Sequence, residues 1–246
     1  MISVAERNRI RERLLALAAE DAVVVGAAIT GSFAAGEGDE WSDIDLAFAI
    51  CGEMPVALDS WTRRMADEFA ALHHWDLPWG TTVYRVFLLP GLLEVDIAFT
   101  PESDFGPRGP KWQTVFGETV DGPETPPSSE RELAGLAWHH VLHARMCIER
   151  GRPWQAEWLI AAAREQVLAL ACLRLGLATR FAKGADQLPP ESTRPLEATL
   201  VSSLDESELR RALTAVAEAL ESELEQTDPA LASRLRPSLL ELTGSA

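Results

Sequence analysis

Two aspartates separated by one residue, Asp43 and Asp45, are the side chains of this sequence best spaced to do chemistry. The apolar run LAFAI follows them, which predicts that the pair opens a buried strand. Alternate residues of a strand share a face, so both carboxylates should point the same way. Carboxylate oxygens on one face are ligands for a hard divalent cation. The spacing therefore predicts a metal site at the start of this strand.

A Gly-Ser turn stands a short loop ahead of the pair. The apolar run 22–29 predicts a buried strand that ends close to Gly31, and residues 32–36 then have the pattern of a first helical turn. Backbone N–H groups in such a turn, here those of Gly31 and Ser32, can hold phosphate groups. Together with the aspartates, the turn indicates metal-dependent nucleotidyl transfer.

A third carboxylate, Asp96, lies in the middle of the apolar run 92–100, which predicts another strand. Burying a carboxylate is costly unless a cation or a hydrogen-bond donor compensates it. Three aspartates on two neighbouring strands would form a two-metal site, in which Asp96 either ligates the second ion or acts as general base on an acceptor hydroxyl. The alternative for Asp96 is a hydrogen-bonded carboxylate of the core.

The stretch from Gly31 to Leu46, GSFAAGEGDEWSDIDL, is similar to the GSxAxGxxxxxSDxDL signature of the DNA polymerase β-like nucleotidyltransferase superfamily. The later strand with Asp96 fits the third carboxylate of that superfamily, and the resemblance covers roughly residues 25–100. It implies catalysis by Asp43, Asp45 and Asp96 with two Mg²⁺ ions, and ATP as co-substrate. Trp41 departs from the pattern, since many relatives have a small or polar residue there.

The second half is similar in layout to the minimal nucleotidyltransferases that modify antibiotics, in which a helical domain closes the active-site cleft. The segment 178–190, ATRFAKGADQLPP, resembles the basic loop that aminoglycoside (3'')(9) adenylyltransferases use on the triphosphate. By that resemblance Lys183 and Arg180 would contact the phosphates. The chain has only two lysines, Lys111 and Lys183, and a triphosphate needs cationic partners beyond its metals. A solvated loop lysine is the alternative.

These observations predict an α+β protein. A nucleotidyltransferase catalytic domain, 1–124, with a mixed β-sheet flanked by helices, would precede an all-α helical bundle domain, 125–246, with the boundary near 122–128. Hydrophobic spacing and capping residues predict helices at 4–20, 55–73, 130–150, 153–177, 205–226 and 229–242. Strands are predicted at 22–29, 45–50, 81–89, 92–100 and 112–116.

Composition argues against several classes of partner and site. The net charge of −16 argues against a protein that grips nucleic acid, and it is compatible both with a polycationic substrate and with simple solubility. The charged start MISVAERNRIRERLL lacks the apolar region of a signal peptide, and no apolar run is long enough to span a bilayer. We therefore expect a cytoplasmic protein with no membrane partner. Three distant cysteines favour neither a disulfide framework nor a zinc site.

The function expected from the sequence is transfer of a nucleoside monophosphate, AMP from ATP, to a hydroxyl of a small molecule. An aminoglycoside-type acceptor is favoured, which would make the protein an antibiotic-resistance enzyme. Two alternatives stay open: a toxin-type enzyme that modifies protein or RNA, and a non-catalytic module that only binds nucleotide. Neither the acceptor nor the oligomeric state follows from the sequence.

Overall fold

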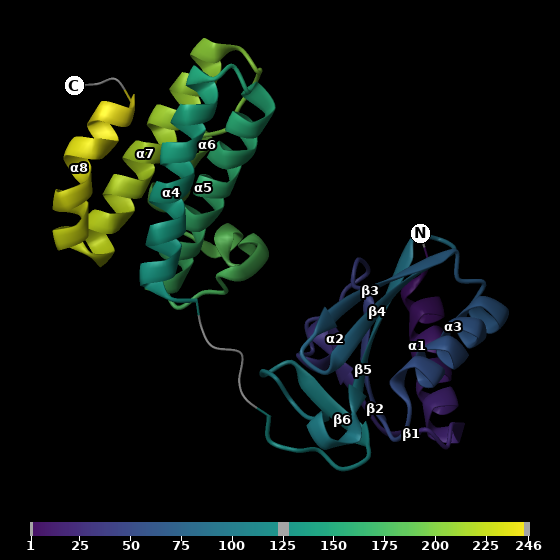
Figure 1. Ribbon diagram of the computed structural model, residues 1–246. Coiled ribbons are helices and arrows are strands. Elements are labelled where there is room, and N and C mark those ends of the chain that lie inside the picture. Colours follow the sequence, from purple (N-terminus) through teal and green to yellow (C-terminus); the bar gives the residue numbers. More distant parts are fainter. Residues whose placement is uncertain (1, 123–127, 244–246) are drawn as a thin grey trace. The chain divides into compact units, whose positions relative to one another are not determined.

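The structure is a computed structural model that describes residues 2–122 and 128–243. The chain divides into two compact units, Met1–Pro126 and Pro127–Ala246, which Figure 1 shows in purple to teal and in teal-green to yellow. Residues 123–127, which belong to the expected boundary segment, lie outside the described residues.

A six-stranded sheet forms the centre of the first unit, with the strand order β3-β4-β5-β2-β1-β6. The strands are β1 Val24–Thr30, β2 Ile44–Ile50, β3 His73–Trp79, β4 Thr82–Leu89, β5 Leu93–Pro101 and β6 Trp112–Phe116. The central strands β2 and β5 run parallel, whereas all other neighbours are antiparallel. The sheet is therefore mixed, and the predicted α+β class is confirmed.

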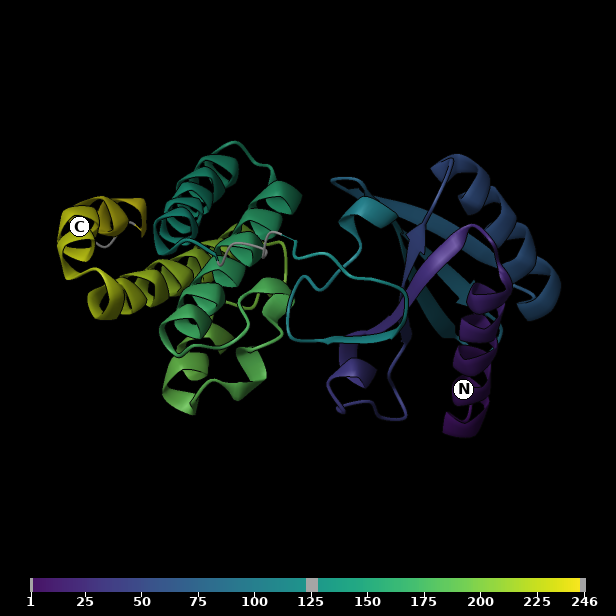
Figure 2. The ribbon, with the colours of Figure 1, turned by 90° about the horizontal axis from the view of Figure 1, so that it is seen from below.

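Two helices, α1 (Val4–Glu20) and α3 (Met54–Phe69), cover one face of this sheet, as Figures 1 and 2 show. Phe48 of β2 and Phe99 of β5 pack there against Trp61 of α3, with ring centroids 4.8 to 6.3 Å apart. Ser3 caps α1 by accepting a hydrogen bond from the backbone N–H of Glu6, as its capping-box sequence predicts. We call this the helix-covered face.

The other face of the sheet has a smaller cluster of buried side chains. It consists of Ala28, Ala47, Ala49, Ala98 and Phe105, with Tyr84 and Trp112 packed against it. Because Ile44 and Leu46 belong to the helix-covered face, alternation along β2 places Asp45 on this other face. We call it the open face.

The second unit contains five α-helices among its described residues. They are α4 Glu130–Glu149, α5 Pro153–Arg174, α6 Pro190–Glu197, α7 Glu206–Thr227 and α8 Pro229–Thr243. α4, α5 and α7 pack around a core that includes Val141, Ile160 and Leu220, all fully buried. This unit is the predicted helical bundle, and Pro153 and Pro229 begin α5 and α8 as their sequence position suggests.

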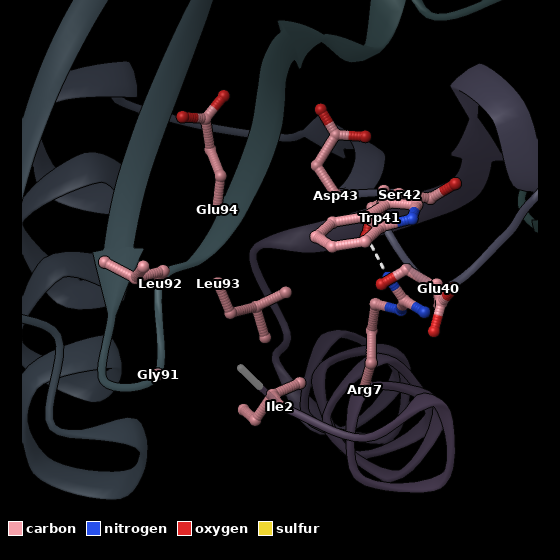
Figure 3. Close-up of a pocket in the computed structure, with 10 residues that line it drawn as sticks. All are labelled: Ile2, Arg7, Glu40, Trp41, Ser42, Asp43, Gly91, Leu92, Leu93 and Glu94. Atoms are coloured by element: carbon pink, nitrogen blue, oxygen red, sulfur yellow. Dashed lines mark hydrogen bonds between the residues drawn. The ribbon is translucent and has the colours of Figure 1, made fainter.

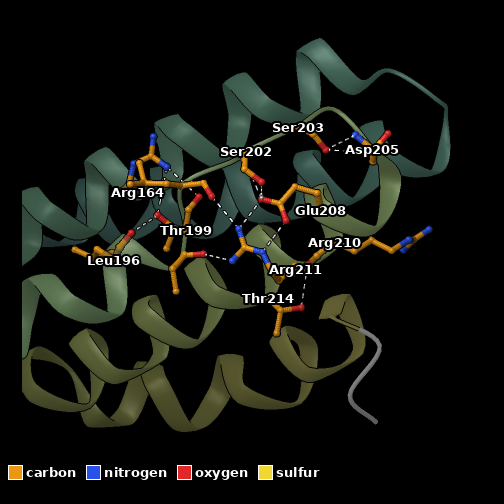
Figure 4. Close-up of polar contacts among 12 residues, drawn as sticks. Arg164, Leu196, Thr199, Ser202, Ser203, Asp205, Glu208, Arg210, Arg211 and Thr214 are labelled. Carbon is orange, nitrogen blue, oxygen red and sulfur yellow. Dashed lines mark hydrogen bonds and ion pairs between the residues drawn. The ribbon is translucent and has the colours of Figure 1, made fainter.

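Two arginines fix the segment between α6 and α7 (Figure 4). Arg164 of α5 donates to the carbonyl of Thr199 at 3.1 Å. Arg211 of α7 donates to the carbonyls of Ala198 and Leu200 and to the carboxylate of Glu208. Buried or half-buried carbonyls in a connecting segment need such donors, so this connection is held to the bundle rather than left to solvent.

Three sequence expectations are corrected by the structure. The helix expected over 55–73 ends at Phe69, because Ala70 adopts a left-handed conformation with φ of 53°. The residues after it, His73–Trp79, form the edge strand β3, which the sequence pattern did not predict. The helix expected over 153–177 ends at Arg174, and Gly176 with φ of 70° turns the chain away.

Candidate active site

The three aspartates come together on the open face of the sheet. Asp45 is the second residue of β2, Asp43 directly precedes that strand, and Asp96 lies opposite Asp45 on the parallel strand β5. One carboxylate oxygen from each lies within 4.8 Å of the others, and all three residues are half-buried. The structure thus brings together the residues that the sequence predicted would converge.

Asp96 is the carboxylate of this cluster with the greatest need for a compensating cation or donor. Its Oδ1 atom is buried and has no hydrogen-bond partner in the described part of the chain. Burial, followed by the nearby charges of Glu94, Asp45 and Asp43, raises the pKa of Asp96 to about 7. Hard oxygen ligands with an uncompensated carboxylate fit Mg²⁺, because its two positive charges would relieve the burial cost and the mutual repulsion.

The Gly-Ser turn follows β1 and lies directly against the aspartates. Gly31 starts the single-turn helix α2 (Gly31–Ala34) with φ of 65°, a conformation that favours glycine. A Cβ atom at this position would overlap the Asp45 carboxylate, with only 2.6 Å to its Cγ atom. The hydroxyl of Ser32 is buried without a hydrogen-bond partner among residues 2–122 and 128–243. The turn therefore offers polar groups beside the carboxylates.

One arginine fixes the loop that leads into Asp43. Arg7 of α1 is only 2% exposed, and its guanidinium donates to the backbone carbonyls of Asp39, Glu40 and Ser42. The Asp39 carboxylate accepts hydrogen bonds from the backbone N–H of Trp41 and the hydroxyl of Ser42, which lower its pKa. The loop is thus held at several points immediately before the first aspartate.

Sequence reasoning missed Arg7, although a signal was present. Arg7 stands seven residues before Leu14 and eleven before Ala18, so it falls on the apolar stripe of its own helix. A charged residue on an apolar stripe must find buried partners, and loop carbonyls are a usual solution. The sequence could therefore have identified a buried arginine here, but not which loop it holds.

A small pocket adjoins the cluster (Figure 3). It has a volume of about 150 Å³, and Arg7, Trp41, Asp43, Leu92 and Glu94 are among its lining residues. Figure 3 shows the carboxylates of Asp43 and Glu94 extending from their backbones toward the same side. A space of this size holds a few water molecules and is far smaller than a nucleotide.

The two basic residues predicted to contact phosphates belong to the second unit. Arg180 and Lys183 are exposed and lie in a segment with the short 3₁₀ helices Arg180–Ala182 and Ala185–Gln187. Phe181 and Ala182 between them have positive φ angles of 56° and 54°. This segment presents both cations to solvent on its own unit, and their contact with a triphosphate stays a prediction.

Comparison with known proteins gives little further information. No family model and no curated protein sequence matches the chain. Among solved structures, an aminoglycoside 6-adenyltransferase from Bacillus subtilis aligns over 98% of this chain and 99% of its own, with 11% identity and a TM-score of 0.44. A similarity this distant carries no argument about function. None of the helices in the described ranges is long and apolar enough to cross a membrane.

Proposed function

We propose that this protein is a Mg²⁺-dependent nucleotidyltransferase that transfers AMP from ATP to a hydroxyl group of a small molecule. The observation that carries the proposal is the convergence of Asp43, Asp45 and Asp96 within 4.8 Å, with the glycine of the Gly-Ser turn in contact with Asp45. Carboxylates and a phosphate-binding turn at one place are the parts that nucleotidyl transfer requires.

Each residue has a distinct role in this proposal. Asp43, Asp45 and Asp96 would hold the metal ions, which when bound would supply positive charge to the phosphates and lower the pKa of the acceptor hydroxyl. Gly31 and Ser32 bind the phosphates through the backbone and hydroxyl of their turn. Lys183 and Arg180 would supply further positive charge to the triphosphate, following the sequence resemblance.

The reaction forms one bond and breaks one. The acceptor oxygen bonds to the α-phosphorus of ATP, the bond from that phosphorus to the bridging oxygen breaks, and pyrophosphate leaves. The hydroxyl proton needs an acceptor, and Asp96 is the candidate base because its carboxylate lies in the cluster on the side of β2 away from the Gly31 turn. Asp96 as a metal ligand only is the alternative role.

The proposed acceptor is an aminoglycoside-type antibiotic, which would also make this a cytoplasmic resistance enzyme. The support for it is the sequence resemblance of the second half and the net charge of −16, which suits a polycation. The resemblance concerns the layout of the second half and the charge is a sum over the whole chain, so the acceptor is tested directly.

The test is pyrophosphate release from ATP and Mg²⁺ with a panel of hydroxylated antibiotics. We expect turnover with at least one acceptor and a loss of at least about 100-fold in Asp45→Asn, since metal ligands are essential to such sites. Asp59→Asn is the matched control, because Asp59 is an exposed aspartate on α3. ATP binding without turnover for any acceptor, or full activity of Asp45→Asn, would refute the proposal.

A further inference from the structure

The edge strand β3 presents large apolar side chains on the open face of the sheet. Asp76 pairs with Arg85, which donates to the carbonyl of Leu58 on α3, so both lie on the helix-covered face. Residues 75, 77 and 79 alternate with Asp76 and must point the other way. The contact between the rings of Trp79 and Tyr84, 6.5 Å apart, agrees with this assignment.

These three side chains are unusually exposed for their type. Trp75 is 53% exposed, Leu77 is 51% exposed and Trp79 is 47% exposed. Single exposed apolar residues are common, but a row of three on one strand is a contiguous patch of the kind that marks a binding surface. We call this row the β3 stripe.

The β3 stripe is continuous with the aspartate cluster through the register of the sheet. Trp75 lies opposite Val86 on β4, Val86 lies opposite Asp96 on β5, and Asp96 lies opposite Asp45 on β2. These four residues form one row across the sheet, on its open face. Trp75 is two strands from Asp96, which is about 10 Å at the usual strand spacing.

The in-line geometry of nucleotidyl transfer indicates which of the two substrates would bind beside the β3 stripe. In the strand order, β1 and its Gly31 turn lie on one side of β2, whereas β5, β4 and β3 lie on the other. If the turn binds the phosphates, the pyrophosphate leaves toward β1. In-line displacement places the attacking hydroxyl opposite the leaving group, which is the side of Asp96 and of the β3 stripe.

Acidic side chains near the β3 stripe favour an acceptor that carries positive charge. Glu94 is exposed and pairs with Leu88 in the next row of the open face, and Figure 3 shows its carboxylate on the same side as that of Asp43. A ring with an apolar C–H face and ammonium substituents would find an aromatic surface and acidic groups together. Amino sugars and aminocyclitols combine these features with hydroxyl groups.

We propose that Trp75 and Leu77 form the acceptor platform of this enzyme, on which the ring of an amino sugar or aminocyclitol lies with one hydroxyl directed toward Asp96. This inference rests on the proposed function and specifies its acceptor site. The ring covers the half of the β3 stripe that is nearest to the aspartate row, so Trp79 lies beyond it, four residues or about 13 Å along the strand from Trp75.

The experiment compares three substitutions in the full chain: Trp75→Ala, Leu77→Ala and Trp79→Ala. All three residues are exposed, so the variants should fold, and circular dichroism checks this. Calorimetric titration with kanamycin and with streptomycin measures binding without turnover, and pyrophosphate release measures KM and kcat. Methyl glucoside, a neutral ring, tests whether the ammonium groups contribute.

We expect Trp75→Ala to weaken binding of at least one antibiotic and raise its KM about tenfold, with KM for ATP unchanged. Leu77→Ala should have a smaller effect and Trp79→Ala an effect below about twofold, because the stripe runs away from the aspartates. Methyl glucoside should bind more weakly than either antibiotic.

Four outcomes would overturn the platform. The first is no binding of either antibiotic, and the second is equal effects of all three substitutions. The third is a concentration-dependent dimer that Trp75→Ala or Trp79→Ala abolishes, which would make the stripe an interface between copies of the chain. The fourth is turnover that is unaffected by Trp75→Ala, which would leave the proposed function intact. Binding that depends on Trp75 without any turnover would instead contradict the proposed function and leave the binding surface in place.

Discussion

The raised pKa of Asp96 predicts that the aspartate cluster destabilises the metal-free protein as pH rises. The carboxyl has a pKa of about 7 in the folded chain, against 3.8 as its ordinary value. Its contribution to stability is therefore fully present below about pH 4 and is lost as pH rises through 7. Replacing Asp96 by asparagine keeps the shape of the side chain and removes this pH dependence.

The magnitude follows from the shift in pKa. About three units correspond to an upper limit of about 4 kcal/mol, at about 1.4 kcal/mol per unit. Asp96 is only half-buried, so solvent screening reduces this, and we expect about 1 to 2 kcal/mol. The wild-type protein should thus lose about 1 to 2 kcal/mol more than Asp96→Asn between pH 4.5 and pH 8.

Urea unfolding of both proteins at the two pH values, in the presence of a chelator, measures this difference. Other carboxylates that stabilise the fold contribute equally to both proteins, so their effect cancels in the comparison. Mg²⁺ at pH 8 should stabilise the wild type and leave Asp96→Asn nearly unchanged. Equal pH dependence of the two proteins, or stabilisation of both by Mg²⁺, would refute the electrostatic account of the cluster.

Two further substitutions test how the site is held. Gly31→Ala places a Cβ atom on the Asp45 carboxylate, so pyrophosphate release should fall at least about 100-fold. Gly36→Ala is the control and should keep most activity, because Gly36 is also at positive φ but has open space around it. Similar losses in both variants would show that backbone strain alone matters. Arg7→Met leaves the carbonyls of the loop before Asp43 without their buried donor, so urea unfolding should show a loss of about 2 to 3 kcal/mol and activity should need more Mg²⁺. Arg11→Met is its control, since Arg11 lies on the same helix α1 and, like Arg7, contacts the ring of Phe33 in α2. An equal effect of both substitutions would argue against the role of the carbonyl contacts.

The aspartate cluster could be predicted because its information is local. Asp43 and Asp45 reveal their shared face through the alternation of one strand, and the apolar run around Asp96 reveals another. Their meeting required β2 and β5 to be neighbours, which alternation cannot show, so the family resemblance supplied that step. The register that places Asp45 opposite Asp96 comes from the structure alone.

The β3 stripe could not be predicted, for a physical reason. The sequence HHWDLPW has Pro78 inside it and a charged residue in its middle, and proline is disfavoured in most strands. It is tolerated in β3 because this is an edge strand, bonded on one side only to β4. Edge position is a property of the whole sheet, so the local pattern extended the preceding helix to His73 and predicted no strand in the residues after it.

The surface beside the aspartates restricts the chemical structure of the acceptor more closely than the net charge of the chain does. A net charge of −16 is spread over 246 residues and suits any cation in solution. The row from Asp45 through Asp96 and Val86 to Trp75 is specific, since it sets an apolar ring surface at a fixed distance from the proposed reaction centre. A polycation without an apolar ring face would satisfy the charge and miss the stripe, so comparing a linear polyamine with an aminocyclitol of similar charge separates the two explanations. Selectivity for the ring, lost in Trp75→Ala, is the result that the geometry requires.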